Sequence, residues 1–224
     1  MNSCLVMLKN SEGYSGGRYC AILFCIALVK QGYKVTVLTN KIPTFLSDFK
    51  SYHELKKITF DETLYNFRKK KYKADHIIVF PDLNPFSSLY ESAVIIANEN
   101  NSTLIMHSFE TPNWFNAHTK KKRKFFLWSG WNFLSKYASS IITMTKIGVR
   151  YAIAHYNKKE VYCAYPSINE NIANNFFELK KNKEIFVIAR FGKFQDHKGG
   201  EQILNLFDVK FSTYTFILFG NLPV

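Results

Sequence analysis

The sequence predicts an α/β fold, a doubly wound parallel sheet followed by the start of a second domain of the same kind. Short runs rich in β-branched and other apolar residues alternate along the chain with longer helical patterns. Most of these runs are apolar on both sides of the pleat, which is typical of parallel strands that helices cover on both faces. Right-handed connections are expected between such strands.

The first domain, placed at residues 1–169, is expected to be Rossmann-like, with at least six strands. These are Cys4–Leu8, Lys34–Thr39, His76–Phe80, Leu104–His107, Ile141–Thr145 and Val161–Ala164. Its expected helices are Arg18–Gln31, Phe86–Asn98, Lys124–Tyr137 and Ile147–His155. Gly32 is expected to cap the first helix, because glycine accepts the left-handed conformation in which many helices end.

The second domain is expected to be incomplete. Residues 170–183 are polar and lysine-rich, and they are interpreted as a linker. Residues 184–224 then predict a strand at Glu184–Ala189, a helix at Gly200–Phe207 and a strand at Thr213–Phe219. A doubly wound domain needs about 100 residues or more, so we expect this one to be truncated at Val224.

Composition excludes several classes of protein. The chain has 224 residues, 47% of them hydrophobic, which is enough for a buried core. Its longest apolar stretch, Cys20–Val29, is shorter than the ~20 residues of a membrane span, and no signal-peptide pattern precedes the first strand. Four cysteines without a C-x-x-C pair are interpreted as reduced thiols, so a cytoplasmic location is expected.

The charge favours an anionic partner. There are 30 Lys and Arg against 17 Asp and Glu, a formal net charge of +13. Three kinds of partner carry the required negative charge: the phosphate groups of a small ligand, an anionic membrane surface and nucleic acid. Net charge alone does not choose among them.

A glycine-rich segment separates the first strand from the first helix. Gly16 and Gly17 are expected in a turn where the backbone approaches a ligand closely and the helix amides hold an anion. The alternative is a plain tight turn. The spacing is not G-x-G-x-x-G, and no acidic residue follows the second strand, so a dinucleotide-binding dehydrogenase is disfavoured.

Two cations are expected near a second ligand-binding position. Arg190 follows the strand that opens the second domain, and Lys198 precedes the next predicted helix. Ligands of α/β sheets bind at this edge, where two cations suit a diphosphate. The alternative is a pair of ordinary surface charges.

The chain resembles the GT-B glycosyltransferases, specifically the large retaining group called group 1 or family four. The matching segments occur in the same order: Gly16-Gly17 with Gln31–Thr39, Tyr137–Thr145, Val161–Asn169, Arg190–Gly199 and Phe216–Asn221. Ala189 stands where the family usually has glycine. The acidic pair that holds the donor ribose and sugar lies, in the family, beyond the last residue of this chain.

The resemblance implies an acceptor-binding first domain and a nucleotide-sugar-binding second domain. Arg190 and Lys198, with Gly16 and Gly17 opposite, would stabilise the leaving diphosphate without a metal or other cofactor. His107 and Glu110 become catalytic candidates for orienting and deprotonating an acceptor hydroxyl, and Asp82 a candidate on the acceptor side. For His107 the alternative is a hydrogen-bonded loop histidine.

One basic run suits an anionic bilayer surface. It consists of Lys120, Lys121, Lys122, Arg123 and Lys124, and an aromatic-rich segment follows. A solvated lysine loop is an equally good interpretation. For the aromatics we favour a helix that covers the sheet.

Three functional hypotheses follow. The first is a glycosyltransferase, or a fragment of one, that transfers a sugar with retention from a nucleotide-sugar to a glycan or lipid-linked acceptor. The second is a non-catalytic or half-enzyme subunit that binds the acceptor and takes its donor site from a partner chain. The third, a nucleic-acid-binding domain, is disfavoured because the cations are spread over several segments and no known nucleic-acid module appears.

Overall fold

The computed structural model describes residues 2–10, 16–82, 84, 87–109, 111–113 and 128–166, together with the backbone of 185–189 and 215–219. The chain divides into two compact units, Met1–Ser167 and Ile168–Val224.

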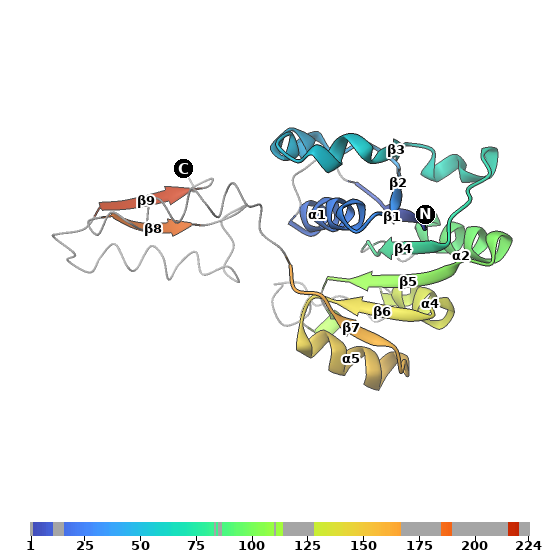
Figure 1. Ribbon diagram of the computed structural model, residues 1–224. Helices are drawn as coiled ribbons and strands as arrows, with labels where there is room; N and C mark the ends of the chain where they lie inside the picture. The colour runs from blue at the N-terminus through green and yellow to red at the C-terminus, as the bar shows by residue number, and fades with distance from the viewer. Residues whose placement is uncertain are drawn as a thin grey trace. The chain divides into compact units, whose positions relative to one another are not determined.

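The first unit is built on a seven-stranded sheet in which every neighbouring pair is parallel, in the order β3-β2-β1-β4-β5-β6-β7 (Figure 1). The strands are β1 (Ser3–Leu8), β2 (Lys34–Thr39), β3 (Thr59–Asp61), β4 (His76–Phe80), β5 (Thr103–Ser108), β6 (Ser140–Thr143) and β7 (Val161–Cys163). The predicted fold class is confirmed.

One strand was not predicted from the sequence. β3 has three residues, none of them fully buried, and pairs at the sheet edge with Thr36–Leu38 of β2. Only Phe60 of its residues is apolar, so this short strand leaves no continuous apolar run in the sequence.

The helices that cover the sheet are α1 (Gly16–Lys30), α2 (Ser88–Asn100), α4 (Ser129–Tyr137) and α5 (Lys146–Tyr156). Three 3₁₀ helices, η1 (Thr44–Phe49), η2 (His53–Lys57) and η3 (Leu64–Lys69), lie on either side of β3 in the sequence. The predicted cap at Gly32 is confirmed: its φ is +85°, and its N–H donates to the Val29 carbonyl at 3.0 Å.

Thr145 was wrongly predicted as the end of a strand. It is the N-cap of α5, and its hydroxyl accepts a hydrogen bond from the Gly148 N–H at 3.0 Å. A β-branched threonine fits a strand by propensity, but its side chain also satisfies a free amide at a helix start. Here the capping bond decides the conformation.

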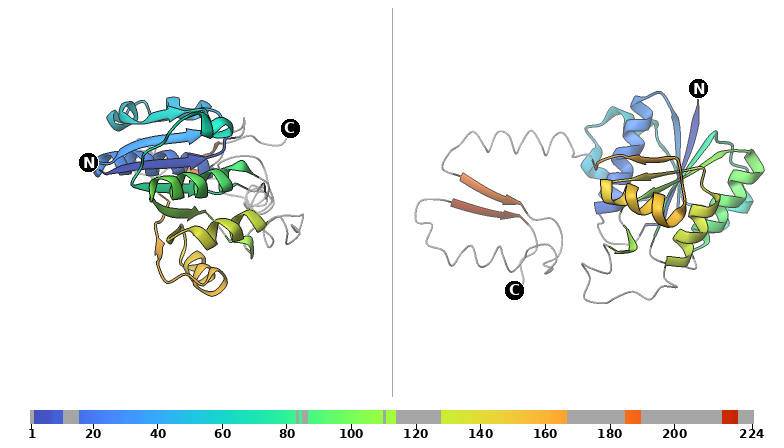
Figure 2. Two further views of the ribbon diagram at one scale, coloured as in Figure 1. Left: turned by 90° about the vertical axis from the view of Figure 1, so that its right-hand side faces the viewer. Right: turned by 90° about the horizontal axis from the view of Figure 1, so that it is seen from below.

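Two hydrophobic cores lie on opposite faces of the sheet, as the alternation of side chains in β1 shows. Cys4, Val6 and Leu8 pack with α1, whereas Leu5 and Met7 pack with α2 and α4. Figure 2 shows the helices on both faces of the sheet. β1 is therefore buried on both sides, as its uninterrupted apolar sequence requires.

The second unit contains β8 (Ile185–Ala189) and β9 (Thr215–Phe219), which pair in parallel with Ile185 opposite Thr215. Both strands were predicted within two residues of these bounds. The predicted linker at 170–183 and the predicted helix at Gly200–Phe207 lie outside the described residues.

No helix in the described ranges is long and apolar enough to cross a membrane.

Gly130 offers a direct test of the packing between α2 and α4. A Cβ added at Gly130 would overlap the ring of Tyr90, whereas one added at Gly16 would meet nothing within 4 Å. We expect Gly130→Ala to lower the free energy of unfolding by about 1–3 kcal/mol, the usual cost of overpacking. The matched control, Gly16→Ala, should leave it unchanged or raise it by up to about 1 kcal/mol. Denaturant unfolding measures both, and equal stability of the two variants would contradict this packing.

Candidate functional site

The strand order places a topological switch point between β1 and β4. From β1 the chain crosses to β2 on one side, and from β4 it crosses to β5 on the other. Ligands of doubly wound sheets bind outside the carboxyl ends of the two strands at such a point. Here those strands are followed by Lys9-Asn10 and Pro81-Asp82.

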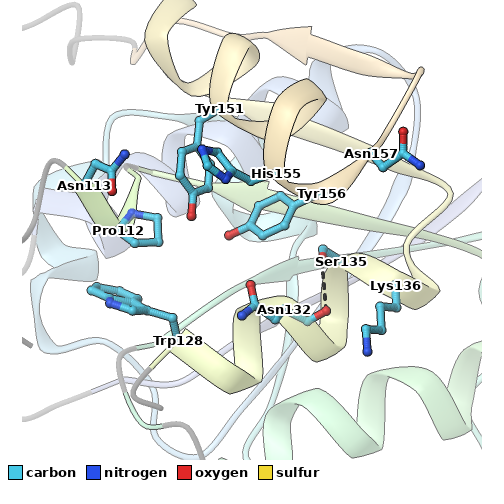
Figure 3. Close-up of a pocket in the computed structure, with 10 residues that line it drawn as sticks. All are labelled: Pro112, Asn113, Trp128, Asn132, Ser135, Lys136, Tyr151, His155, Tyr156 and Asn157. Carbon is cyan, nitrogen blue, oxygen red and sulfur yellow. Dashed lines mark hydrogen bonds between the residues drawn. The ribbon is translucent and has the colours of Figure 1, made fainter. Parts of the chain in front are cut away.

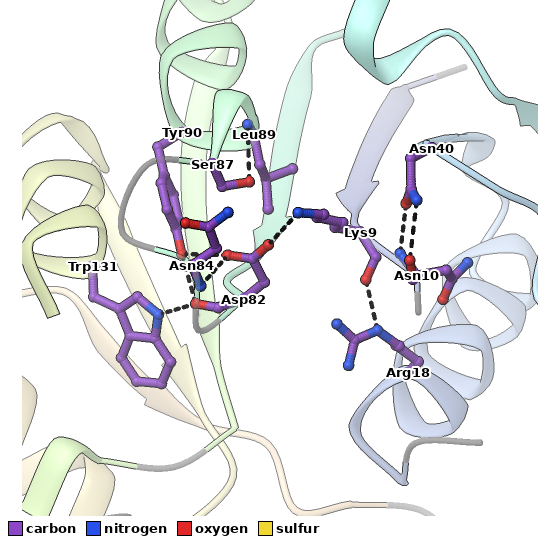
Figure 4. A network of polar contacts seen from close by, with 10 residues as sticks. All are labelled: Lys9, Asn10, Arg18, Asn40, Asp82, Asn84, Ser87, Leu89, Tyr90 and Trp131. Atoms are coloured by element: carbon purple, nitrogen blue, oxygen red, sulfur yellow. Dashed lines mark hydrogen bonds and ion pairs between the residues drawn. The ribbon is translucent and has the colours of Figure 1, made fainter. Parts of the chain in front are cut away.

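An ion pair joins the two strand ends. Lys9 Nζ lies 3.6 Å from Asp82 Oδ2, and the Asp82 side chain is only 7% exposed against 26% for Lys9 (Figure 4). A buried carboxylate is tolerated only when it is paired and hydrogen-bonded. The family resemblance made Asp82 a candidate on the acceptor side, and in the structure the Lys9 ammonium lies beside its carboxylate.

Asp82 is held in place by two helices. Its main-chain carbonyl accepts hydrogen bonds from the Tyr90 hydroxyl of α2 and the Trp131 Nε1–H of α4, both at 2.6 Å. Its Oδ1 accepts from the Asn84 N–H at 2.9 Å and lies 3.1 Å from the Tyr90 hydroxyl. Burial raises the pKa of Tyr90, so its hydroxyl stays protonated and remains a donor. These contacts occupy Oδ1 and leave Oδ2 on the Lys9 side.

A reciprocal asparagine pair joins the carboxyl ends of β1 and β2. The Asn10 N–H donates to Asn40 Oδ1 at 2.7 Å, and Asn40 Nδ2 donates to the Asn10 carbonyl at 3.0 Å. Asn10 Nδ2 donates to the Lys41 carbonyl at 2.7 Å. Asn10 Oδ1 is buried, and no described residue donates a hydrogen bond to it. Among the described residues this oxygen therefore stays available as an acceptor for a ligand at this edge.

Arg18 adds a second cation near the switch point. Its Nε donates to the Lys9 carbonyl at 2.6 Å, which ties the first turn of α1 to the end of β1. Burial lowers the pKa of Arg18 while the charge of Asp82 opposes this shift. The guanidinium remains charged, because an arginine pKa starts far above neutral pH.

The two glycines open α1 and do not lie in a preceding turn, which corrects the prediction. A Cβ on Gly17 would come within 2.9 Å of the Phe109 ring, so the absence of a side chain lets Phe109 pack on the helix start. Gly16 is exposed, with open space at the position of a Cβ. Packing explains Gly17, and a role for either glycine in binding a donor stays a prediction.

His107 lies at the carboxyl end of β5, where aromatic rings enclose it. Its ring stacks on Phe80 with centroids 4.4 Å apart and contacts Phe24 edge-on at 5.0 Å. The residue is 3% exposed, and burial lowers its pKa to about 4. His107 is therefore a neutral imidazole at physiological pH, and Phe80, two residues before Asp82, links it to the switch point.

The other predicted site residues lie outside the described residues. These are Glu110, Arg190, Lys198 and the basic run Lys120, Lys121, Lys122, Arg123 and Lys124. Within the described residues, no group of three or more His, Cys, Asp or Glu side chains is placed to hold a metal ion.

Sequence reasoning did not identify Lys9, Asn10 or Asn40 as site residues. A usable signal existed, since Lys9 and Asn40 directly follow predicted strands and Asn10 comes one residue later. Ligand-binding residues are commonly found at such strand ends. Tyr90 and Trp131 carried no such signal. They resemble ordinary core residues of amphipathic helices, and only the folded structure brings their polar atoms to Asp82.

Acidification should destabilise the protein through His107. The pKa of His107 is about 4 in the fold and about 6.5 in an unfolded chain, so the unfolded state binds a proton first as the pH falls. Above about pH 6.5 the imidazole is neutral in both states, so its titration does not change the free energy of unfolding. Between about pH 6.5 and pH 4 the unfolded state takes up the proton, which lowers the free energy of unfolding by roughly 3 kcal/mol. We expect His107→Phe to reduce the loss of Tm between pH 7 and pH 4.5.

The exposed His53 supplies the control for this experiment. His53→Phe should keep the pH dependence of the unaltered protein. If Tm falls between pH 7 and pH 4.5 by as much in His107→Phe as in the unaltered protein, the idea that buried His107 causes the acid destabilisation is wrong.

Comparison with solved structures finds the same fold in glycosyltransferases. UGT2 from Phytolacca americana, complexed with UDP-2fluoro-glucose and pterostilbene, superposes with a TM-score of 0.62 at 11% identity. A glycosyltransferase from Rickettsia africae gives a TM-score of 0.57 at 13% identity. An alpha-glucosyltransferase in complex with UDP and a 13-mer DNA gives 0.60 at 15% identity.

These superpositions cover 97–98% of this chain, which itself spans 66%, 60% and 55% of the three solved chains, respectively. No protein-family model and no curated protein sequence matches the chain. At such low identity the likeness is one of fold. The chain is thus structurally similar to glycosyltransferases, two of which were solved with UDP or a UDP-sugar analogue.

Proposed function

We propose that the chain is part of a glycosyltransferase that uses a nucleotide-sugar donor, and that its switch point binds the acceptor. The observation that carries this proposal is the ion pair between Lys9 and Asp82, whose charged atoms lie 3.6 Å apart at the switch point of the sheet. The fold of this sheet is similar to that of glycosyltransferases. A site there needs polar groups held rigidly at the carboxyl ends of the strands, and Asp82 meets that requirement.

Asp82 is better placed than His107 to contact an acceptor. Its Oδ2 faces Lys9, whereas the His107 ring is enclosed by Phe24, Phe80 and Phe109. In the proposed reaction Oδ2 accepts a hydrogen bond from the acceptor hydroxyl and orients its oxygen towards the sugar. His107 then acts through packing, by holding the end of β4 in position.

On the donor side, transfer places negative charge on the departing diphosphate. Arg190 and Lys198 are proposed to neutralise it, as the resemblance implies, and the exposed Gly16 is proposed to approach it from α1. Side-chain cations supply the positive charge in this scheme, so it invokes no metal.

UDP-sugars are the first donors to test, because two of the similar structures contain UDP or a UDP-sugar analogue. We further propose a glycan or lipid-linked acceptor and retention at the anomeric carbon. NMR of the product separates retention from inversion. The half-enzyme alternative predicts acceptor binding by this chain, with turnover only after a partner chain is added.

The Lys9–Asp82 pair is tested by substitution in the protein encoded by the complete reading frame. Release of UDP from UDP-glucose, UDP-galactose and UDP-N-acetylglucosamine is measured in the presence of acceptor extracts. Asp82→Asn keeps the shape of the side chain but removes its charge. We expect it to lower kcat/KM by a factor of roughly 100, the scale of losing one preorganised polar group, and Lys9→Ala by roughly 10 or more.

Lys56→Ala is the matched control, since Lys56 is an exposed lysine of η2 and lies outside the network of Figure 4. It should leave kcat/KM unchanged. A loss below about threefold in both Asp82→Asn and Lys9→Ala, with turnover intact, would contradict a role of the switch point in the reaction.

A further inference from the structure

A groove of about 650 Å³ lies between α4 and α5, away from the Lys9–Asp82 pair. One wall comes from α4, the opposite wall from the second half of α5, and one end from Pro112 and Asn113 after β5 (Figure 3). None of the switch-point residues Lys9, Asn10 and Asp82 lines it.

Polar side chains converge on the groove from both helices. The hydroxyls of Tyr151 and Tyr156 point into it from α5, and the Asn132 side chain faces them from α4 (Figure 3). The Tyr156 hydroxyl is buried and interacts with the Tyr151 hydroxyl beside it. Each hydroxyl can both donate and accept, so the pair keeps the capacity for a further hydrogen bond to a bound molecule. Burial also raises the pKa of Tyr156, which keeps the hydroxyl a donor.

Aromatic and amide groups both line the groove. Trp128 and Tyr151 supply ring surface, and Asn113 and Asn132 supply amides that both donate and accept hydrogen bonds. This combination suits a ligand with apolar C–H faces and hydroxyls around its edge, which is the chemistry of a sugar ring.

The charge of the groove narrows the class of ligand. Its described lining contains no carboxylate, and its basic side chains, Lys136 and His155, come from the C-terminal halves of the two helices. Sites for phosphate-bearing ligands commonly gather several Arg and Lys side chains, and the described lining contains no arginine and a single lysine. A neutral ligand fits better than a nucleotide or an acidic chain.

We propose that the groove between α4 and α5 binds a short neutral oligosaccharide, separately from the switch-point site. The nine residues of α4 span about 14 Å at 1.5 Å per residue, so the groove accommodates more than one sugar ring. The proposal does not rest on the proposed function, because it holds whether or not the chain takes part in sugar transfer.

The test uses three uncharged trisaccharides, maltotriose, cellotriose and chitotriose, with ligand-observed NMR and titration calorimetry on the full 224-residue chain. We expect at least one of them to bind with a Kd of about 1 mM or tighter, a normal range for a small open site. Tyr156→Phe, which removes only the hydroxyl, should raise that Kd by about fivefold or more, and Asn132→Ala should do the same.

Two controls make the result specific. Tyr162→Phe changes an exposed tyrosine of β7 outside the groove and should leave the Kd unchanged. Lys56→Ala, at an exposed lysine of η2 outside the groove, should also leave it unchanged. Binding is measured without a donor or turnover, so the outcome is independent of the transferase assay. Near-ultraviolet circular dichroism checks the fold of each variant, and the partly exposed Asn132 keeps the test valid if Tyr156→Phe does not fold.

Two results would overturn the proposal. Absence of binding by all three trisaccharides at about 10 mM would show that the groove holds only water. Binding that survives both Asn132→Ala and Tyr156→Phe without change would place the sugar elsewhere on the chain.

Discussion

The main-chain carbonyl of Asp82 is the point on which the fold and the candidate site both depend. It accepts hydrogen bonds from Tyr90 of α2 and Trp131 of α4, which ties the end of β4 to two helices that lie far apart in the sequence. Gly130 makes this arrangement possible, because any side chain there would displace the Tyr90 ring. The same packing that covers the sheet therefore orients the carboxylate that faces Lys9.

The two faces of the sheet contribute to the switch point in different ways. On the α2 and α4 face, buried polar atoms donate to Asp82 and fix its backbone. On the α1 face, a cluster of rings encloses His107 and extends through Phe109 to Gly17. Hydrogen bonds hold the end of β4 on the first face, and close-packed rings hold it on the second. The end of β4 is therefore constrained from both sides of the sheet.

The proposed groove and the switch point differ in the chemistry they offer. The switch point presents charges, Lys9 and Arg18 against Asp82, that are partly removed from water. The groove presents rings, amides and phenolic hydroxyls with little charge. The two places therefore offer a ligand different interactions, charge at the switch point and ring contacts with amide hydrogen bonds in the groove.

Much of the fold was predictable from sequence, because strands buried on both faces are apolar throughout and helices end at recognisable residues. The other six strands of this sheet and the Gly32 cap followed from these patterns, whereas β3 escaped because only Phe60 of its three residues is apolar. Asp82 was predictable as a strand-end carboxylate. Its partners were not, since Lys9 is 73 positions away and Trp131 resembles any core residue of a helix.

Tertiary structure alone decided how these groups meet. Hydrogen bonds between residues distant in the chain leave no local pattern, and the enclosure of His107 depends on rings contributed by α1, β4 and the segment after β5. The sequence by itself determined which residues are apolar and where strands and helices form. The packing of the helices determined which polar atoms are buried together, because burial removes water and leaves each such atom dependent on its protein partner.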